Sequence, residues 1–228
     1  MVVSNVERIR SALRQRIVMG DLTAGTHLNE IALSREFGVS RVPVREAIRA
    51  LESEGLVESK LHFGSRVSEL PAEDAADLFE IREEIERATA RKAARHAPRE
   101  GEVADEEWLA TRAEITAILA EGDAALAEKR LDQLVGLNMR FHQAVASLAG
   151  STVLSVLLVT IGGSIERLYK ADAPQRSKTS WPEHHTIIDA IDAGDVDAAG
   201  NAMAGHVRRS KRSYFRGLPK DEAGPGEG

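Results

Sequence analysis

The 228-residue sequence contains no cysteine, and only 4% of its residues are aromatic. Without cysteine there are no disulfide bonds, no thiolate metal sites and no cysteine nucleophile, a composition that fits a reducing compartment. The N-terminal segment has no continuous apolar core, so we expect no signal peptide. No apolar run approaches the ~20 residues that a transmembrane helix needs. The sequence therefore predicts a cytoplasmic protein with no membrane partner.

Positive charge is scarce, since the formal net charge is −6, but the deficit is uneven. Residues 1–70 contain ten Lys and Arg against nine Asp and Glu, so the acidic excess lies in the rest of the chain. This division indicates a neutral-to-basic module joined to an acidic one. The large acidic part argues against an architectural protein that binds DNA through net charge alone.

Helical spacing of apolar residues and glycine stop signals divide the first 70 residues into short elements. Three helices are expected at residues 5–19, 29–38 and 40–54, with Asn29 and Ser40 as N-caps. LVESK and SRVSEL then predict two short strands around HFG, which is the pattern of a β-hairpin. This order predicts a winged helix-turn-helix domain over residues 1–70.

After Pro71 the sequence is rich in Ala and Leu and has no hairpin signals. Six helices are expected at residues 73–96, 103–121, 124–149, 152–170, 181–193 and 195–215. The fold class is therefore mainly α: a winged helix-turn-helix followed by an all-α bundle of about six helices over residues 71–216. The last segment, residues 217–228, is expected to be a disordered tail.

An arginine row lies on the third predicted helix. Arg41, Arg45 and Arg49 recur every four residues and so share one helical face. In a helix-turn-helix the second helix of the motif enters the major groove, where the arginine fork suits guanine edges and phosphate. The alternative is a solvent-exposed face in which these arginines pair with Glu46 and Glu52.

Two other residues fit the DNA-binding interpretation of this helix. Ser40 at its start has a hydroxyl and a backbone N–H for a phosphate, where the helix dipole also favours an anion. Pro43 lies in the first turn, where its missing N–H removes no intrahelical hydrogen bond.

Three histidines of the acidic part lie next to apolar helical residues. Asn138 and His142 are four apart and share a helical face, His184 begins an apolar stripe, and His206 lies among small residues. Three neutral imidazoles and an oxygen donor suit zinc, nickel or a similar divalent ion. The alternatives are three separate buried histidines, or a metal-dependent enzyme. An enzyme would need a general base, and Glu183, adjacent to His184 on a helix, points elsewhere.

The segment LNEIALSREFGVSRVPVREAIRALESEGLV resembles the signature of the GntR family of bacterial transcription regulators. MGDLTAGTHL fits the segment that precedes the signature, except that Ala24 replaces a proline. The resemblance implies contacts with operator DNA from Ser40, Arg41, Arg45 and a wing-tip glycine, here Gly64. Further candidates for this surface are Pro43, Arg49, His62, Phe63 and Arg66.

EIREEIERATARKAA, NMRFHQAVASLAG, EHHTIIDAI and AMAGHV are similar to the FCD effector domain of one GntR subfamily. The resemblance implies a divalent metal ion, zinc or nickel, held by Asn138, His142, His184 and His206. Asn138 departs from the usual aspartate, and its neutral amide is a weaker donor. In such domains a small carboxylate effector completes the metal's coordination, and Arg82 would hold its other end. The alternative for Arg82 is an ion pair with Glu86.

Together these features predict a ligand-responsive transcriptional regulator, expected to be a repressor. One recognition helix contacts only a few base pairs, so we expect a homodimer on a palindromic double-stranded DNA operator. The alternative function is a metal-dependent hydrolase or isomerase that uses the same histidines.

Overall fold

The computed structural model describes residues 4–60, 63–99 and 101–217, with the backbone alone at residues 72 and 169–177. Its contacts divide the chain into two units. One comprises the residues up to Pro71 together with Thr160–Arg167, and the other comprises Ala72–Val159 and the residues from Leu168 onward. The described residues form eight helices and two strands, which confirms the mainly α fold. None of these helices is both long and apolar enough to cross a membrane.

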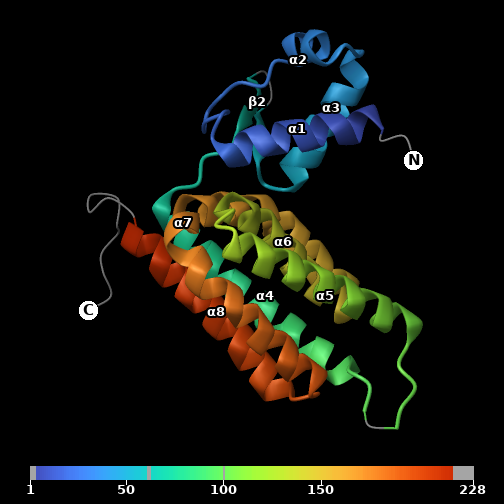
Figure 1. The fold of residues 1–228 in the computed structure, drawn as a ribbon. Coiled ribbons are helices and arrows are strands. Elements are labelled where there is room, and N and C mark those ends of the chain that lie inside the picture. The colour runs from blue at the N-terminus through green and yellow to red at the C-terminus, as the bar shows by residue number, and fades with distance from the viewer. Residues whose placement is uncertain (1–3, 61–62, 100, 218–228) are drawn as a thin grey trace. The chain divides into compact units, whose positions relative to one another are not determined.

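The first unit contains the predicted winged helix-turn-helix (Figure 1). Its elements are α1 (Asn5–Met19), α2 (Glu30–Phe37), α3 (Arg41–Ser53), β1 (Val57–Lys60) and β2 (Gly64–Val67). The Asn29 side chain caps α2 by accepting hydrogen bonds from two backbone N–H groups, at 2.9 and 3.0 Å. Gly38 ends α2 in the left-handed conformation, as a glycine allows. The apolar faces of the three helices and the hairpin meet in one core: Ile9, Leu13, Ile17, Leu28, Leu33, Val44, Ala47, Ile48, Leu51, Leu56, Val57 and Val67.

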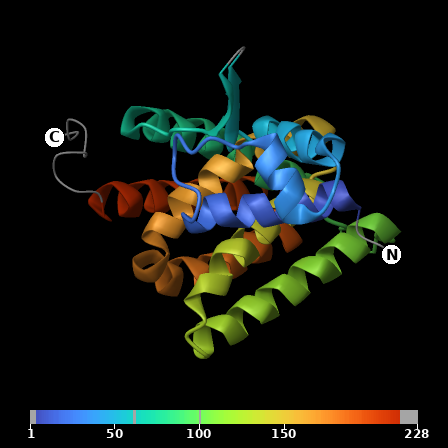
Figure 2. The ribbon, with the colours of Figure 1, turned by 90° about the horizontal axis from the view of Figure 1, so that it is seen from above.

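The two strands form an antiparallel hairpin in which Val57 lies opposite Val67 and Lys60 opposite Gly64. Both valines are buried, and this anchors the base of the hairpin to the helices. From this base the hairpin projects away from α1, α2 and α3 (Figure 2). It is the wing of the motif.

The second unit is a helical bundle (Figure 1). Its helices are α4 (Ala72–His96), α5 (Glu106–Ala127), α6 (Leu131–Leu148), α7 (Thr152–Asp192) and α8 (Val196–Gly217). The helices α4 and α8 run side by side, and so do α5 and α6. Large side chains such as Ile115, Ile118, Phe141, Trp181 and Ile187 fill the core.

Two predicted helix boundaries are wrong. The predicted helices 152–170 and 181–193 are parts of a single helix, α7, although the segment between them is rich in polar residues and contains a proline, Pro174. The C-terminal part of α7 is anchored by buried residues including Trp181 and Ile191, and tertiary packing of this kind overrides weak local preferences. The turn predicted at residues 121–123 also lies inside a helix, since α5 continues to Ala127. The predicted tail lies outside the described residues, except for Gly217, which ends α8.

Candidate functional site

The N-terminal half of α3 presents a polar face. Ser40 is the N-cap residue, and its hydroxyl makes no capping hydrogen bond, so it is available to another acceptor or donor. Arg41, Arg45 and Arg49 are exposed on α3, while Val44 on the opposite face is fully buried. The predicted arginine row therefore lies on one accessible surface.

Glu30, the first residue of α2, binds two of these arginines. Its Oε1 accepts from Arg45 Nε at 3.0 Å, and its Oε2 accepts from an Arg45 terminal nitrogen and an Arg41 terminal nitrogen, both at 2.9 Å. The hydrogen bond from Arg45, together with that from Arg41, lowers the pKa of the Glu30 carboxyl to about 2, so it stays ionised at neutral pH. The arginines thus pair across the two helices of the motif and not with Glu46 or Glu52 on their own helix.

The other candidates of this surface have different surroundings. Pro43 is the third residue of α3 and is half-buried. Gly64 begins β2 with a φ of 73°, and Phe63 beside it is 70% exposed. Arg66 is exposed and donates to the carbonyl oxygen of Gly25 at 3.1 Å. His62 lies outside the described residues.

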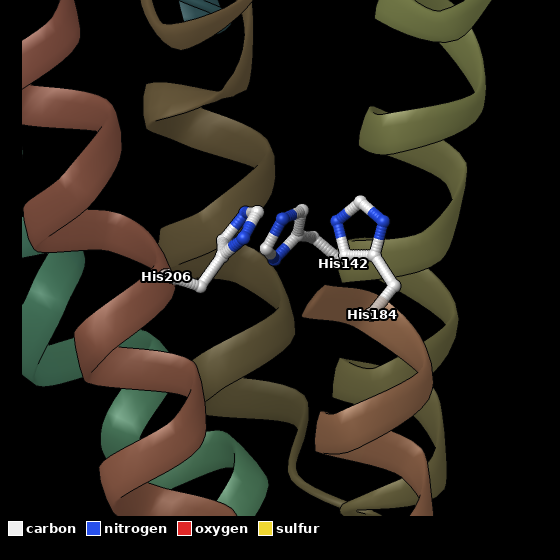
Figure 3. Close-up of side chains that lie close together, drawn as sticks. All are labelled: His142, His184 and His206. Carbon is white, nitrogen blue, oxygen red and sulfur yellow. The ribbon is translucent and has the colours of Figure 1, made fainter. Parts of the chain in front are cut away.

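In the second unit, three predicted metal ligands converge (Figure 3). His142 comes from α6, His184 from α7 and His206 from α8, and their rings point toward one another. One ring nitrogen of each lies within 4.8 Å of the others, and their exposed fractions are 3%, 0% and 0%. We call these three residues the histidine cluster.

Burial keeps the histidine cluster neutral. Loss of solvation, reinforced by the neighbouring imidazoles and by Arg82, lowers the pKa of His184 well below its ordinary value and that of His206 to about 4. Burial also lowers the pKa of His142, against the opposing attraction of Glu86. A neutral imidazole has a lone pair for a metal ion, whereas a protonated one has none.

Two of the three imidazoles contact carboxylates. His142 Nδ1 pairs with Glu86 Oε2, and the other oxygen of Glu86 accepts from Arg82 Nε at 2.5 Å. His206 Nδ1 lies 2.8 Å from Glu183 Oε2. A carboxylate on one ring nitrogen directs the other nitrogen toward a metal, the usual arrangement around metal-binding histidines. Glu183 is thus a partner of His206 and not a general base.

His184 lacks such a partner among the described residues, since both of its buried ring nitrogens have no hydrogen-bond partner. The amide nitrogen of Asn138, one turn before His142 on α6, is likewise buried without one. Unsatisfied polar groups of this kind are costly in a protein interior unless a ligand binds them. The available imidazole nitrogens therefore fit a divalent metal ion such as zinc or nickel, whereas the Asn138 N–H, which cannot bind a metal, would donate to another group.

The Arg82 guanidinium is fully buried on α4 and forms the ion pair with Glu86 that the sequence left open as an alternative. Glu86 connects Arg82 to the cluster, because the same carboxylate contacts His142.

Three residues that contact the side chains of these sites were not identified from the sequence as part of them. Glu30 lies 11 and 15 residues before the arginines it binds, and no local spacing connects them. Glu86 was named only as a partner for Arg82, although it also binds His142. Trp181, buried beside His184, had no motif of its own.

The fold defines a class of protein: a DNA-binding regulator with an N-terminal winged helix-turn-helix and a C-terminal helical domain. Residues 5–67 match the model of the bacterial regulatory proteins of the gntR family, and residues 77–209 match the FCD domain. The chain belongs to the GntR family of bacterial transcription regulators, in the group with a C-terminal FCD domain. This is a family of regulators and not of enzymes.

The relatives match most of the chain. The "Probable D-xylose utilization operon transcriptional repressor" of Paenarthrobacter nicotinovorans is 28% identical over 203 residues, which are 88% of this chain and 84% of that protein. The HTH-type transcriptional repressor RspR of Escherichia coli K12 is 27% identical over 209 residues, 91% of this chain and 87% of the relative.

Solved structures share the fold. The crystal structure described as that of "a putative transcriptional regulator GntR from Rhodococcus sp. RHA1" superposes with a TM-score of 0.71 at 23% identity, over 95% of this chain and all of that one. E. coli McbR/YncC gives a TM-score of 0.72 at 21% identity, over 94% and 99% of the two chains.

Proposed function

We propose that this regulator is a repressor whose operator binding is controlled by a small carboxylate at a metal site formed by the histidine cluster. The repressor assignment is supported by the names of two relatives, both called repressors. The convergence of three buried histidines from three helices carries the proposal of a metal site. As a DNA-binding regulator the protein acts in the cytoplasm.

The metal would be held by His142, His184 and His206, with the Asn138 oxygen as a fourth, weaker donor. When bound, the ion supplies a Lewis-acidic position that can take a carboxylate oxygen. The low pKa values of the clustered imidazoles support this role, because protons do not compete for their lone pairs at neutral pH.

Arg82 supports the carboxylate class of the effector. It is a buried cation next to the histidine cluster, and a guanidinium binds a carboxylate through two parallel hydrogen bonds. Glu86 contacts both Arg82 and His142. An acid that binds Arg82 would therefore affect Glu86, and Glu86 also contacts the proposed metal ligand His142.

The operator would be contacted by Ser40, Arg41, Arg45 and Gly64. The same surface would include Pro43, Arg49 and Arg66. Two copies of this surface on a homodimer would bind the two halves of a palindrome. The exposure of the arginine row in the absence of DNA supports this assignment.

A selection from random DNA duplexes tests the proposal. The metal-loaded protein should enrich an inverted repeat, and a panel of small mono- and dicarboxylates should then contain an acid that lowers affinity for it. That acid should have no effect on the Arg82→Ala variant. If no sequence is enriched, the DNA-reading assignment is overturned, whereas an enriched operator insensitive to every acid would overturn the effector class.

A further inference from the structure

The three metal-ligand candidates differ in how their rings are oriented. His142 has the Glu86 carboxylate on one nitrogen, and His206 has that of Glu183. His184 has no hydrogen-bond partner on either nitrogen among the described residues. Something other than a hydrogen bond must therefore set the direction of its ring, because a metal ligand that rotates freely binds weakly.

Two aromatic rings pack against the His184 ring. The Trp181 ring lies 4.8 Å from the His184 ring, centroid to centroid, and nearly perpendicular to it at 78°. The Phe141 ring lies 4.3 Å away on a 40° tilt. Both side chains are almost completely buried, at 1% and 0% exposed. The imidazole is therefore confined by apolar walls.

Trp181 is itself fixed by α5, the helix beside α6. A methyl group at Gly122 would lie 1.8 Å from Cζ2 of the indole, 2.0 Å from Cε2 and 2.5 Å from Cη2, so the ring occupies the space that any other residue would fill. On the adjacent residue, Asp123 Oδ1 accepts from the indole Nε1 at 3.0 Å. The same oxygen lies 3.1 Å from His185 Nε2. The indole is thus held by its close fit against Gly122 and by the hydrogen bond from its Nε1.

We propose that Trp181, which packs against Gly122, is the positioning residue of His184. It would orient the His184 ring as Glu86 and Glu183 orient the rings of the other two histidines. The inference rests on the proposed metal site and adds a role for α5, which contributes no ligand. It also explains why α5 has a glycine in its C-terminal half, where an alanine would form helix better. The glycine leaves the space that the indole fills.

The test uses the complete chain with nickel as the probe. The methyl group added by Gly122→Ala would overlap the Trp181 indole and displace it. We therefore expect the Kd for nickel to rise about tenfold or more, the usual effect of removing support from a metal ligand. Trp181→Phe loses the indole N–H that Asp123 Oδ1 accepts, so we expect this variant also to bind nickel more weakly than wild type. The two losses should not add in the double variant Trp181→Phe/Gly122→Ala, because both changes displace the same ring.

Gly136→Ala is the matched control. Gly136 lies on α6, and a methyl group there would meet no atom within 4 Å. It makes the same glycine-to-alanine change within a helix, and we expect unchanged nickel affinity. The melting temperature of each variant in chelator separates a loss of stability from a loss of metal affinity.

A spectroscopic signal distinguishes positioning from packing. The chain has two tryptophans, so Trp108→Phe leaves Trp181 as the single indole. Nickel quenches nearby indole fluorescence, and the emission of this variant should fall with the same midpoint as nickel uptake measured by calorimetry. In Trp108→Phe/Gly122→Ala the quenching should need about tenfold more nickel.

Each result decides something. Equal nickel affinity in wild type, Gly122→Ala and Trp181→Phe, in proteins that do bind nickel, would overturn the positioning role and leave the metal site in place. A wild-type protein that takes up no nickel or zinc would overturn the metal site and this inference with it. If Gly122→Ala does not fold, Trp181→Phe alone decides, since wild-type nickel affinity in that variant contradicts the proposal.

Discussion

Arg45 and Glu30 show how a side chain that we propose to contact DNA is held in the absence of DNA. The carboxylate takes one edge of the guanidinium, through Nε and one terminal nitrogen, and so fixes its plane. The end of the guanidinium that carries both terminal nitrogens remains directed away from that edge. This is the pair of donors that matches the two acceptors of guanine in the major groove.

Replacing Arg45 by Ala should weaken operator binding roughly 5- to 150-fold, the loss expected for one bidentate base contact. Arg45 is 48% exposed in its ion pair, and exposed pairs contribute little to stability, so the fold should be unaffected. Gel-shift titration at fixed salt measures the change, with Arg16→Ala on α1 as a variant of equal charge. Unchanged operator affinity for Arg45→Ala would contradict the assignment of α3 as the recognition helix.

The histidine cluster should make the metal-free protein sensitive to acid. The folded state favours neutral imidazoles, with a pKa of about 4 for His206, whereas unfolded histidines titrate near 6.5. Protonation below pH ~6.5 therefore favours the unfolded chain, and stability should fall as pH decreases from ~6.5 toward about 4. Each such histidine contributes up to about 1.4 kcal/mol per pH unit in this window.

Urea unfolding in chelator at pH 7.5 and pH 5 measures this effect. His206→Gln should lose less stability between the two conditions than wild type, because one of the titrating groups is gone. Equal unfolding free energies of wild type at both pH values would mean that the imidazoles are not held neutral.

At the scale of elements, the helices of the first unit were predictable to within a residue or two because their ends carry local signals. Asn29 and Gly38 cap α2 as the sequence indicated. The glycine at position 122 gave the opposite result, since a local pattern read it as a turn. The Trp181 ring, 59 residues further along the chain, occupies the space that a side chain at position 122 would need, and no local spacing contains that information.

In the candidate metal site, too, some residues could be predicted from the sequence and others could not. The motif resemblance named His142, His184 and His206 before the structure brought them together. The groups that support them could not be predicted from spacing. Glu86 belongs to a different helix from His142, and only folding brings the two together.

The wing gives a prediction at this scale. Gly64 has a φ of 73°, and a methyl group there would lie 2.7 Å from His27 Nε2. Gly64→Ala should therefore cost about 1 kcal/mol of backbone strain and also displace the wing, which weakens operator binding. Gly20→Ala is the matched control, because Gly20 has a φ of 85° and no atom within 4 Å of the added methyl group.

Gel-shift and melting measurements on both glycine variants separate the two effects. Similar losses of stability with weaker DNA binding only for Gly64→Ala would support the role of the wing. Operator affinities that fall equally in both variants would show that Gly64 acts only through backbone strain.

For the whole molecule, the proposed palindromic operator requires two copies of α3 at a fixed spacing. We expect the full chain, of 24.8 kDa, to sediment at micromolar concentration with twice that mass. Binding two half-sites at once gains affinity without any new base contact. A monomer at concentrations that saturate the operator would contradict the dimer.

Calorimetric titration of the chelator-stripped full chain with zinc or nickel measures whether the histidine cluster binds a metal ion. We expect uptake of one ion per chain, a higher melting temperature when the ion is bound, and loss of both in His184→Ala. His96→Ala, which removes an exposed histidine at the end of α4, should behave as wild type. A wild-type protein that takes up no ion, or a His184→Ala variant that takes up the ion as well as wild type does, would show that the cluster is not a metal site.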